Sequence, residues 1–148
     1  MATTKGGDKF EPTLEYMVRM ATNASAVNVG FLAEAKYPDG KPVAMIAAIQ
    51  NFGAPRAGIP PRPFFSDMIK KRSPEWPKAI GDLLVANRYD ALRTLQMTGE
   101  AVTGQLRKQI QDTNAPPLKP ATIRRKGFDK PLIDTGHMWN SVDYQVKA

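Results

Sequence analysis

The amino-acid sequence predicts an α+β fold in which a small, mostly antiparallel sheet packs against several helices, including one long helix. Residues 27–31 and 142–146 alternate apolar and polar side chains, which is typical of strands with one buried face. Residues 75–112 carry apolar side chains at spacings near three and four, which indicates helix. A chain of 148 residues is long enough for one domain with its own core.

The N-terminal part is predicted to contain an arm, a short helix and a strand. Residues 1–12 are expected to form a flexible arm ahead of a single domain at residues 13–148. Residues 14–24 place apolar side chains on one helical face, and residues 27–31 follow as a strand. The next segment, "YPDGKP", is a turn, because its proline presets one backbone angle and Asp-Gly tolerates positive ones.

A helix and a proline-rich segment are predicted next. Residues 43–53, "VAMIAAIQNFG", are rich in alanine, so we expect a helix that Gly53 ends. Residues 54–63 contain four prolines, a density that excludes a regular element. The segment "FFSDMIKKR" then opens a helix, which Phe64 and Phe65 are expected to anchor in the core.

Most of residues 75–112 is predicted to be helical, with room for a break. Ser73 is expected to cap the start of this segment, with Pro74 as its first helical residue. Gly99 and Gly104 each cost about 1 kcal/mol inside a helix. They therefore either permit the close approach of another backbone or mark a bend.

Residues 113–131 are predicted to form a long basic loop. Its basic residues, with only Asp129 opposing them locally, are Lys119, Arg124, Arg125, Lys126 and Lys130. Three interpretations stay open: the loop grips nucleic-acid phosphates, contacts an acidic protein, or is simply solvated. A loop of this length inside a domain is usually functional or disordered.

The chain is predicted to close with a helical turn near residues 134–136 and a strand at residues 142–146. The two strands must pair with each other, with weaker strands that the pattern misses, or with another chain. Because so few strands make a poor independent sheet, this pattern favours an oligomer.

The composition limits which partners and which kinds of site the chain can have. The chain has 21 Lys plus Arg against 14 Asp plus Glu, a net charge of +7, which suits acidic partners such as nucleic acid or an acidic protein. It contains no cysteine and one histidine, which excludes disulfides, thiolate metal sites and a cysteine nucleophile. No segment has the length of a membrane span, and the first residues do not read as a signal peptide.

The sequence offers one weak catalytic candidate. His137 could act as a base that Asp134 orients, with Ser141 as the nucleophile. Adjacency in sequence rarely supplies triad geometry, and no segment suggests an oxyanion hole. We therefore expect no enzymatic activity, no cofactor, no metal and no small-molecule substrate.

The segment "IPPRPFF" allows two interpretations. Its prolines match a PxxP ligand with an internal arginine, the composition that SH3 domains bind. The segment also runs directly into Phe64 and Phe65, which favours a stiff internal loop anchored by buried rings. In that case Arg62 is available for a carboxylate or carbonyl, in its own subunit or across an interface.

Two segments carry a family resemblance. "AAIQNFGAPRAGIPPRPFF" resembles a small aliphatic helix ended by Asn/Glu, Phe/Tyr and Gly, followed by a variable loop and I-P-x-R-P-F. "KPLIDTGHMWNSVDYQV" resembles P-L-x-x-T-G-x-L/M-x-x-S-I/V-x-Y/W-x-V. Together, over residues 43–68 and 129–146, they are similar to the head–tail joining and tail-completion proteins of tailed bacteriophages. This family includes tail components of lambdoid siphophages and virion morphogenesis proteins of Mu-like phages.

The resemblance implies a structural virion protein, made in the bacterial host cytoplasm, that forms a ring in the neck or at the tail end. Its implied partners are further copies of the chain, portal-adaptor, neck or tail proteins, and non-specifically the packaged DNA. A tail terminator or a nucleic-acid-binding protein remains the alternative. The basic residues named above and Arg62 are the candidate partner contacts. The matching positions, taken as fold determinants together with the neighbouring Phe65, are Phe52, Gly53, Ile59, Pro60, Arg62, Pro63, Phe64, Leu132, Thr135, Gly136, Met138, Ser141, Val142 and Tyr144.

Overall fold

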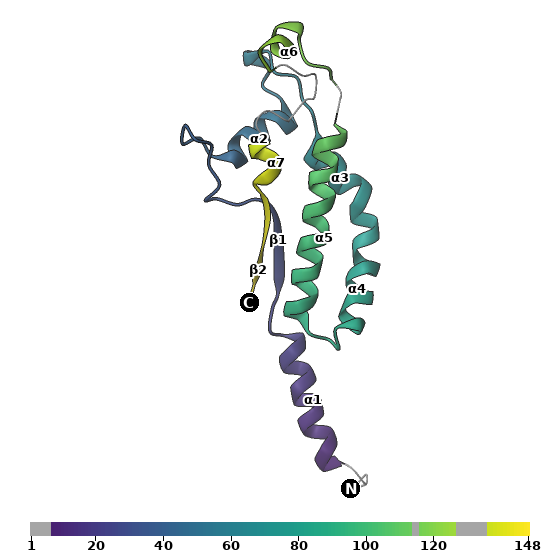
Figure 1. Cartoon of the computed structure of the whole chain (residues 1–148). Helices are drawn as coiled ribbons and strands as arrows, with labels where there is room; N and C mark the ends of the chain where they lie inside the picture. Colours follow the sequence, from purple (N-terminus) through teal and green to yellow (C-terminus); the bar gives the residue numbers. More distant parts are fainter. Residues whose placement is uncertain (1–6, 114–115, 127–135) are drawn as a thin grey trace.

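The structure, a computed structural model, describes residues 7–113, 116–126 and 136–148 and arranges helices around a two-stranded antiparallel sheet (Figure 1). It confirms the predicted α+β class and the long helix. In chain order the elements are α1 (Gly7–Ala21), β1 (Ala26–Phe31), α2 (Val43–Phe52), the 3₁₀ turn η1 (Pro55–Ala57), α3 (Phe64–Arg72), the 3₁₀ turn η2 (Ser73–Glu75), α4 (Trp76–Ala86), α5 (Ala91–Asp112), α6 (Pro120–Lys126), α7 (His137–Asn140) and β2 (Val142–Lys147).

The two predicted strands pair with each other. The register runs from Ala26 opposite Lys147 to Phe31 opposite Val142. Helix α5 runs beside this sheet (Figure 1), and the ring of Tyr144 lies against Gly99. A Cβ atom at Gly99 would come within 2.5 Å of that ring. The glycine therefore permits the close approach of a side chain rather than of another backbone, and α5 continues through it.

The predicted break separates α4 from α5. Arg88 and Tyr89 adopt positive φ angles of 55° and 62°, which reverse the chain so that α4 packs beside α5 (Figure 1). Asp90 caps α5 by accepting a hydrogen bond from the Arg93 N–H at 3.2 Å. Its carboxylate also accepts from Asn23 Nδ2 at 3.1 Å, and Asn23 Oδ1 accepts from the Leu92 N–H at 2.7 Å. These bonds attach the end of α1 to the start of α5.

The core lies where α2, α3 and the C-terminal half of α5 meet β2. Phe64 is 1% exposed and meets Phe31 and Phe65 edge to face, with ring centroids 6.3 and 6.4 Å apart. The other buried members of this cluster are Val43, Ala47, Met68, Val102, Leu106, Ile110, Met138 and Val142. The prediction that Phe64 anchors α3 is confirmed, whereas Phe65 is only partly buried.

The connection between α2 and α3 is held by backbone geometry and by one amide. Gly53 ends α2 as predicted, at φ +76°, and a Cβ there would come within 2.8 Å of the Pro61 nitrogen. The buried Asn51 Oδ1 accepts hydrogen bonds from the N–H groups of Phe65 and Ser66, at 3.0 and 3.1 Å. Asn51 therefore caps the start of α3 from the neighbouring helix, since Pro63 provides no side-chain cap.

Several expectations about element boundaries are wrong. Helix α1 begins at Gly7, so the second half of the expected arm is helical, and residues 1–6 lie outside the described part. Helix α6 occupies part of the expected loop at 113–131. The proline-rich segment holds the short turn η1, because Pro55 suits its first position. Ser73 does not cap a helix, because the chain passes from α3 through η2 into α4 without a side-chain cap.

The predicted fold determinants differ in burial and backbone conformation, and two of them lie outside the described residues. Phe52 is 74% exposed, so its side chain is not part of the described core. Gly136 adopts φ +75° at the start of α7, and Val142 is buried. Leu132 and Thr135 lie outside the described residues.

Candidate interaction site: a basic cleft

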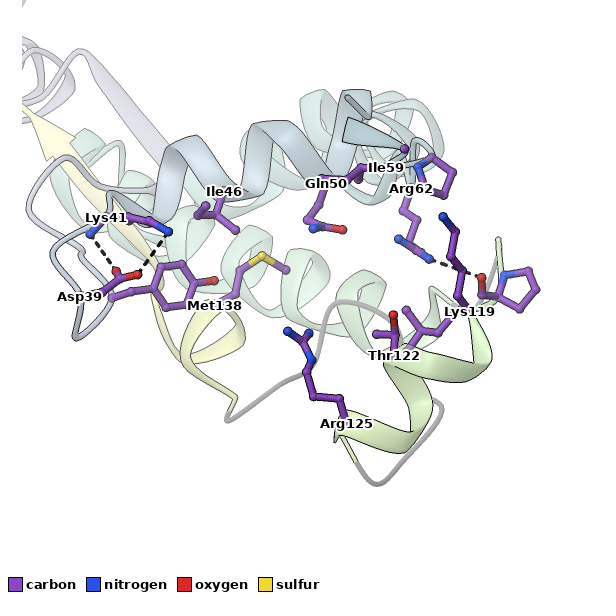
Figure 2. A pocket seen from close by; sticks show the side chains of 15 residues that line it. Asp39, Lys41, Ile46, Gln50, Ile59, Arg62, Lys119, Thr122, Arg125 and Met138 are labelled. Carbon is purple, nitrogen blue, oxygen red and sulfur yellow. Dashed lines mark hydrogen bonds and ion pairs between the residues drawn. The ribbon is translucent and has the colours of Figure 1, made fainter. Parts of the chain in front are cut away.

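A cleft of about 690 Å³ lies between α2, the segment after η1, α6 and α7 (Figure 2). Ile46 and Gln50 of α2 stand four residues apart and line one wall, because side chains at that spacing share a helix face. Thr122 and Arg125 of α6 share a face in the same way and line the opposite wall. The charged residues of the lining are Asp39, Lys41, Arg62, Lys119 and Arg125.

Arg62 holds two walls of the cleft together. It is 6% exposed, and its Nε donates to the Pro116 carbonyl at 3.0 Å and its Nη2 to the Pro117 carbonyl at 3.5 Å. Burial lowers the pKa of the guanidinium, which still stays charged at neutral pH. The expectation that Arg62 is a partner contact is thus corrected, because it bonds to carbonyls of its own chain.

Lys41 is partly neutralised within the cleft. Its Nζ lies 3.5 Å from Asp39 Oδ2, and both side chains are well exposed. The Lys41 N–H donates to Asp39 Oδ1 at 3.0 Å, and this bond is the main reason that the pKa of Asp39 lies below its usual value. An exposed pair of this kind adds little stability, but it uses the only carboxylate among the described lining residues.

Lys119 and Arg125 supply the unopposed charge. In Figure 2 both extend from α6 and the residues just before it toward α2. Neither forms an ion pair with a carboxylate of the described chain. Apolar groups, including Ile59 and Met138, line the same cleft. Such a surface can bind the carboxylates of an acidic protein segment or the phosphates of a nucleic acid.

The structure brings together only part of the predicted basic set. Arg124 is exposed and does not line the cleft, and the Lys126 side chain and Lys130 lie outside the described part of the chain. Lys41 was missed by the sequence reasoning, which identified its segment only as a turn. No local signal could have found it, because the turn meets α6 only through the fold.

The catalytic candidates do not form a nucleophile–base pair. His137 Nε2 lies 2.7 Å from the Lys36 carbonyl oxygen, and the imidazole packs against the Tyr37 ring with centroids 4.8 Å apart. Ser141 Oγ donates to the His137 backbone carbonyl at 2.7 Å rather than to the imidazole. Asp134 lies outside the described residues.

Among the described residues, no cluster of three or more His, Cys, Asp or Glu side chains could hold a metal ion. No helix in that part of the chain is long and apolar enough to cross a membrane.

Comparison of the chain with protein-family models, with curated proteins and with solved structures yields no match. The family resemblance therefore depends on the two sequence motifs, and the interaction site depends on the geometry described above.

Proposed function

We propose that the chain is a structural protein of a tailed-bacteriophage virion, a neck or tail-completion component that assembles as a ring at the head–tail junction. The two motifs support the family, and one structural observation supports assembly. Helix α1 extends away from the other elements (Figure 1), and several of its large apolar side chains are exposed. Leu14, Met17 and Val18 are 48%, 38% and 55% exposed and share one helical face.

A helix that exposes such an apolar face to water gains little stability from packing. Helices of about 12–15 residues are marginal in water without tertiary packing. α1 has 15 residues, and Asn23, just after its C-terminal end, bonds to the start of α5. A surface that covers the apolar face would stabilise the helix, and a neighbouring subunit supplies that surface. In a closed ring each subunit gives one surface and receives another.

The basic cleft fits the same proposal. Lys119 and Arg125 lack carboxylate partners in the described chain, so they are available to acidic neighbours in the neck or to packaged DNA. The proposed role is structural, without catalysis or a cofactor, and its site of action is the virion.

Labelling of virions tests the position directly. An antibody against this chain should mark the head–tail junction in electron micrographs. Label that stays at the end of the tail tube after removal of the head would instead favour a tail terminator. A virion without the chain at either place would reject the proposal.

Assembly of the purified chain tests the role of α1. Leu14→Glu with Val18→Glu keeps helix propensity but charges the apolar face, and we expect loss of the oligomer in native mass spectrometry. Arg19→Glu is the matched control, because it changes charge on another face of α1. Equal loss in both variants would show that charge, rather than the apolar face, controls assembly.

The cleft also supports a second function, nucleic-acid binding. DNA affinity should then fall steeply with salt, and Lys119→Ala with Arg125→Ala should reduce the slope by about 2 on a log–log plot. Arg124→Ala is the control, because Arg124 is basic and exposed but lies outside the cleft. A slope that does not change in the double variant rejects this function.

A further inference from the structure

A second hollow, which we call the α2–α3 groove, lies beside β1 and has a volume of about 520 Å³. Small side chains at Ala44 and Ala48 of α2 form part of its lining, and both are exposed. Larger apolar groups, Phe52 from α2 with Phe65 and Ile69 from α3, stand beside them. The groove is thus mostly apolar, and the small side chains of Ala44 and Ala48 form its α2 side.

The exposure of Phe52 shows that no described segment of the single chain covers this end of the groove. Its side chain is 74% exposed, the largest exposed fraction among the big apolar residues described. Covering a phenylalanine contributes about 1.5–3 kcal/mol, so a partner that reaches it gains appreciably. Contiguous exposed apolar surface of this kind marks protein interaction sites.

The apolar face of α1 has the complementary form. Leu14, Met17 and Val18 follow the i, i+3, i+4 spacing by which amphipathic helices enter grooves. Large side chains on α1 would meet the small ones at Ala44 and Ala48, which lets the two helices approach closely.

Charge also matches between the two surfaces. Residues 8–15 of α1 carry three acidic residues, Asp8, Glu11 and Glu15, and one basic residue, Lys9, so this segment is acidic on balance. The last turn of α3, directly after Ile69, carries the basic residues Lys70, Lys71 and Arg72. An α1 helix in the groove therefore brings an acidic segment beside a basic helix end.

The chain cannot place its own α1 in this groove. Asn23 and Ser25 fix the end of α1 at the Ala26 end of β1, through bonds to Asp90 and Lys147. The groove lies at the other end of β1, beside Val29 and Phe31, and α1 points away from it (Figure 1). The occupant must therefore come from another molecule.

We propose that the apolar face of α1 docks in the α2–α3 groove of a second copy of this chain. The inference rests on the proposed function, since it names the contact through which the ring forms. The two surfaces are different, so the contact is head to tail, and a closed ring forms where the rotation between copies permits it.

The absence of cysteine allows a clean crosslinking test. Val18→Cys and Ala48→Cys are made as separate full-length variants, mixed and mildly oxidised. Docking holds the thiols at millimolar effective concentration, so the mixture should yield about tenfold more disulfide-linked dimer than either variant alone. Arg19→Cys mixed with Ala48→Cys is the control, because Arg19 lies on another face of α1. Equal yield from this control overturns the inference.

A charge substitution in the groove gives an independent readout. Phe52→Glu should weaken self-association at least about tenfold without unfolding the chain, because the ring is exposed in the single copy. Val85→Glu is the matched control, since Val85 is 62% exposed on α4, outside the groove. Weakening by Val85→Glu alone would overturn the inference.

The outcomes separate this contact from the proposed function. If oligomers form but Val18→Cys and Ala48→Cys do not crosslink, the docking of α1 is overturned. The chain could then still form a ring through another interface. A chain that stays monomeric at all concentrations also overturns the docking. The proposed function is judged separately, by the position of the chain in the virion.

Discussion

Phe64 is the largest fully buried side chain among the described residues. Its ring is 1% exposed and contacts the rings of Phe31 and Phe65 edge to face. Phe64→Ala should lower the free energy of unfolding by about 3–5 kcal/mol, because a large cavity replaces the ring. Urea denaturation at a concentration where the chain is monomeric measures this loss. Phe52→Ala is the control and should change stability by less than about 0.5 kcal/mol. Near-wild-type stability of Phe64→Ala would revive the interpretation of "IPPRPFF" as a docking peptide.

Phe52 and Phe64 also show that the sequence alone does not predict which of two motif phenylalanines is buried. Both belong to the quoted motifs, and both were expected to determine the fold. Helix α2 is apolar on nearly all faces, so its pattern does not reveal which face is buried. The role of Gly53 was predicted correctly because ending a helix depends on local backbone conformation. The burial of Phe52 depends instead on which elements pack against α2.

Asp90 should make stability depend on pH. Hydrogen bonds from Asn23 Nδ2 and then from the Arg93 N–H hold the pKa of this carboxyl below its usual 3.8. The folded state therefore binds a proton less readily than the unfolded state. The stabilisation is complete above about pH 4 and is lost as the pH falls through the folded pKa.

Asp90→Asn tests this dependence. Asparagine also caps helices well but does not titrate, so the variant should lose less stability than the wild type between about pH 4 and pH 2. Urea midpoints across that range measure the difference. Asp39 has a lowered pKa too, but it titrates in both proteins and cancels in the comparison. Parallel curves would show that Asp90 is not the group responsible.

At the scale of elements, two glycines of α5 should respond oppositely to the same change. Gly104→Ala should stabilise the protein by up to about 1 kcal/mol, because alanine favours helix and a Cβ there has no atom within 4 Å. Gly99→Ala should destabilise it by about 1–3 kcal/mol, because the new Cβ would lie 2.5 Å from the Tyr144 ring. Thermal or urea unfolding of both variants makes the comparison. Stabilisation by Gly99→Ala would mean that β2 does not pack on α5 at this point.

The elements themselves were predicted unevenly, for physical reasons. β1, α2, α3 and β2 have strong local signals, and all were found. The start of α1 was missed because residues 1–12 look polar and were therefore predicted to form an arm. α6 was missed because prolines and basic residues dominate its surroundings, although Pro120 suits the first position of a helix.

At the scale of the whole molecule, the cleft was only half predictable. The basic character of residues 119–130 was evident from sequence, and Lys119 and Arg125 do line the cleft. The opposite wall comes from α2 and the turn before it. Strand alternation and helix periodicity describe each element alone, so they cannot say that α2 faces α6.

Self-association should change the protection of α1 while leaving that of α5 unchanged. In the dilute monomer, the amides of residues 7–21 should exchange hydrogen rapidly, because the helix is short and packs on little else. At concentrations where copies associate, the same amides should be protected at least about tenfold more, since docking stabilises the helix by mass action. Amides in the buried part of α5, near Leu106 and Ile110, should be protected equally in both conditions and serve as the internal control.

Hydrogen exchange followed by mass spectrometry at two concentrations measures both helices in one experiment. Phe52→Glu should keep α1 in rapid exchange at the higher concentration, because that variant places a charge in the receiving groove and leaves the sequence of α1 unchanged. Strong protection of α1 in the dilute monomer would mean that the helix is stable without a partner. The exposed face of Leu14, Met17 and Val18 would then no longer be an argument for assembly.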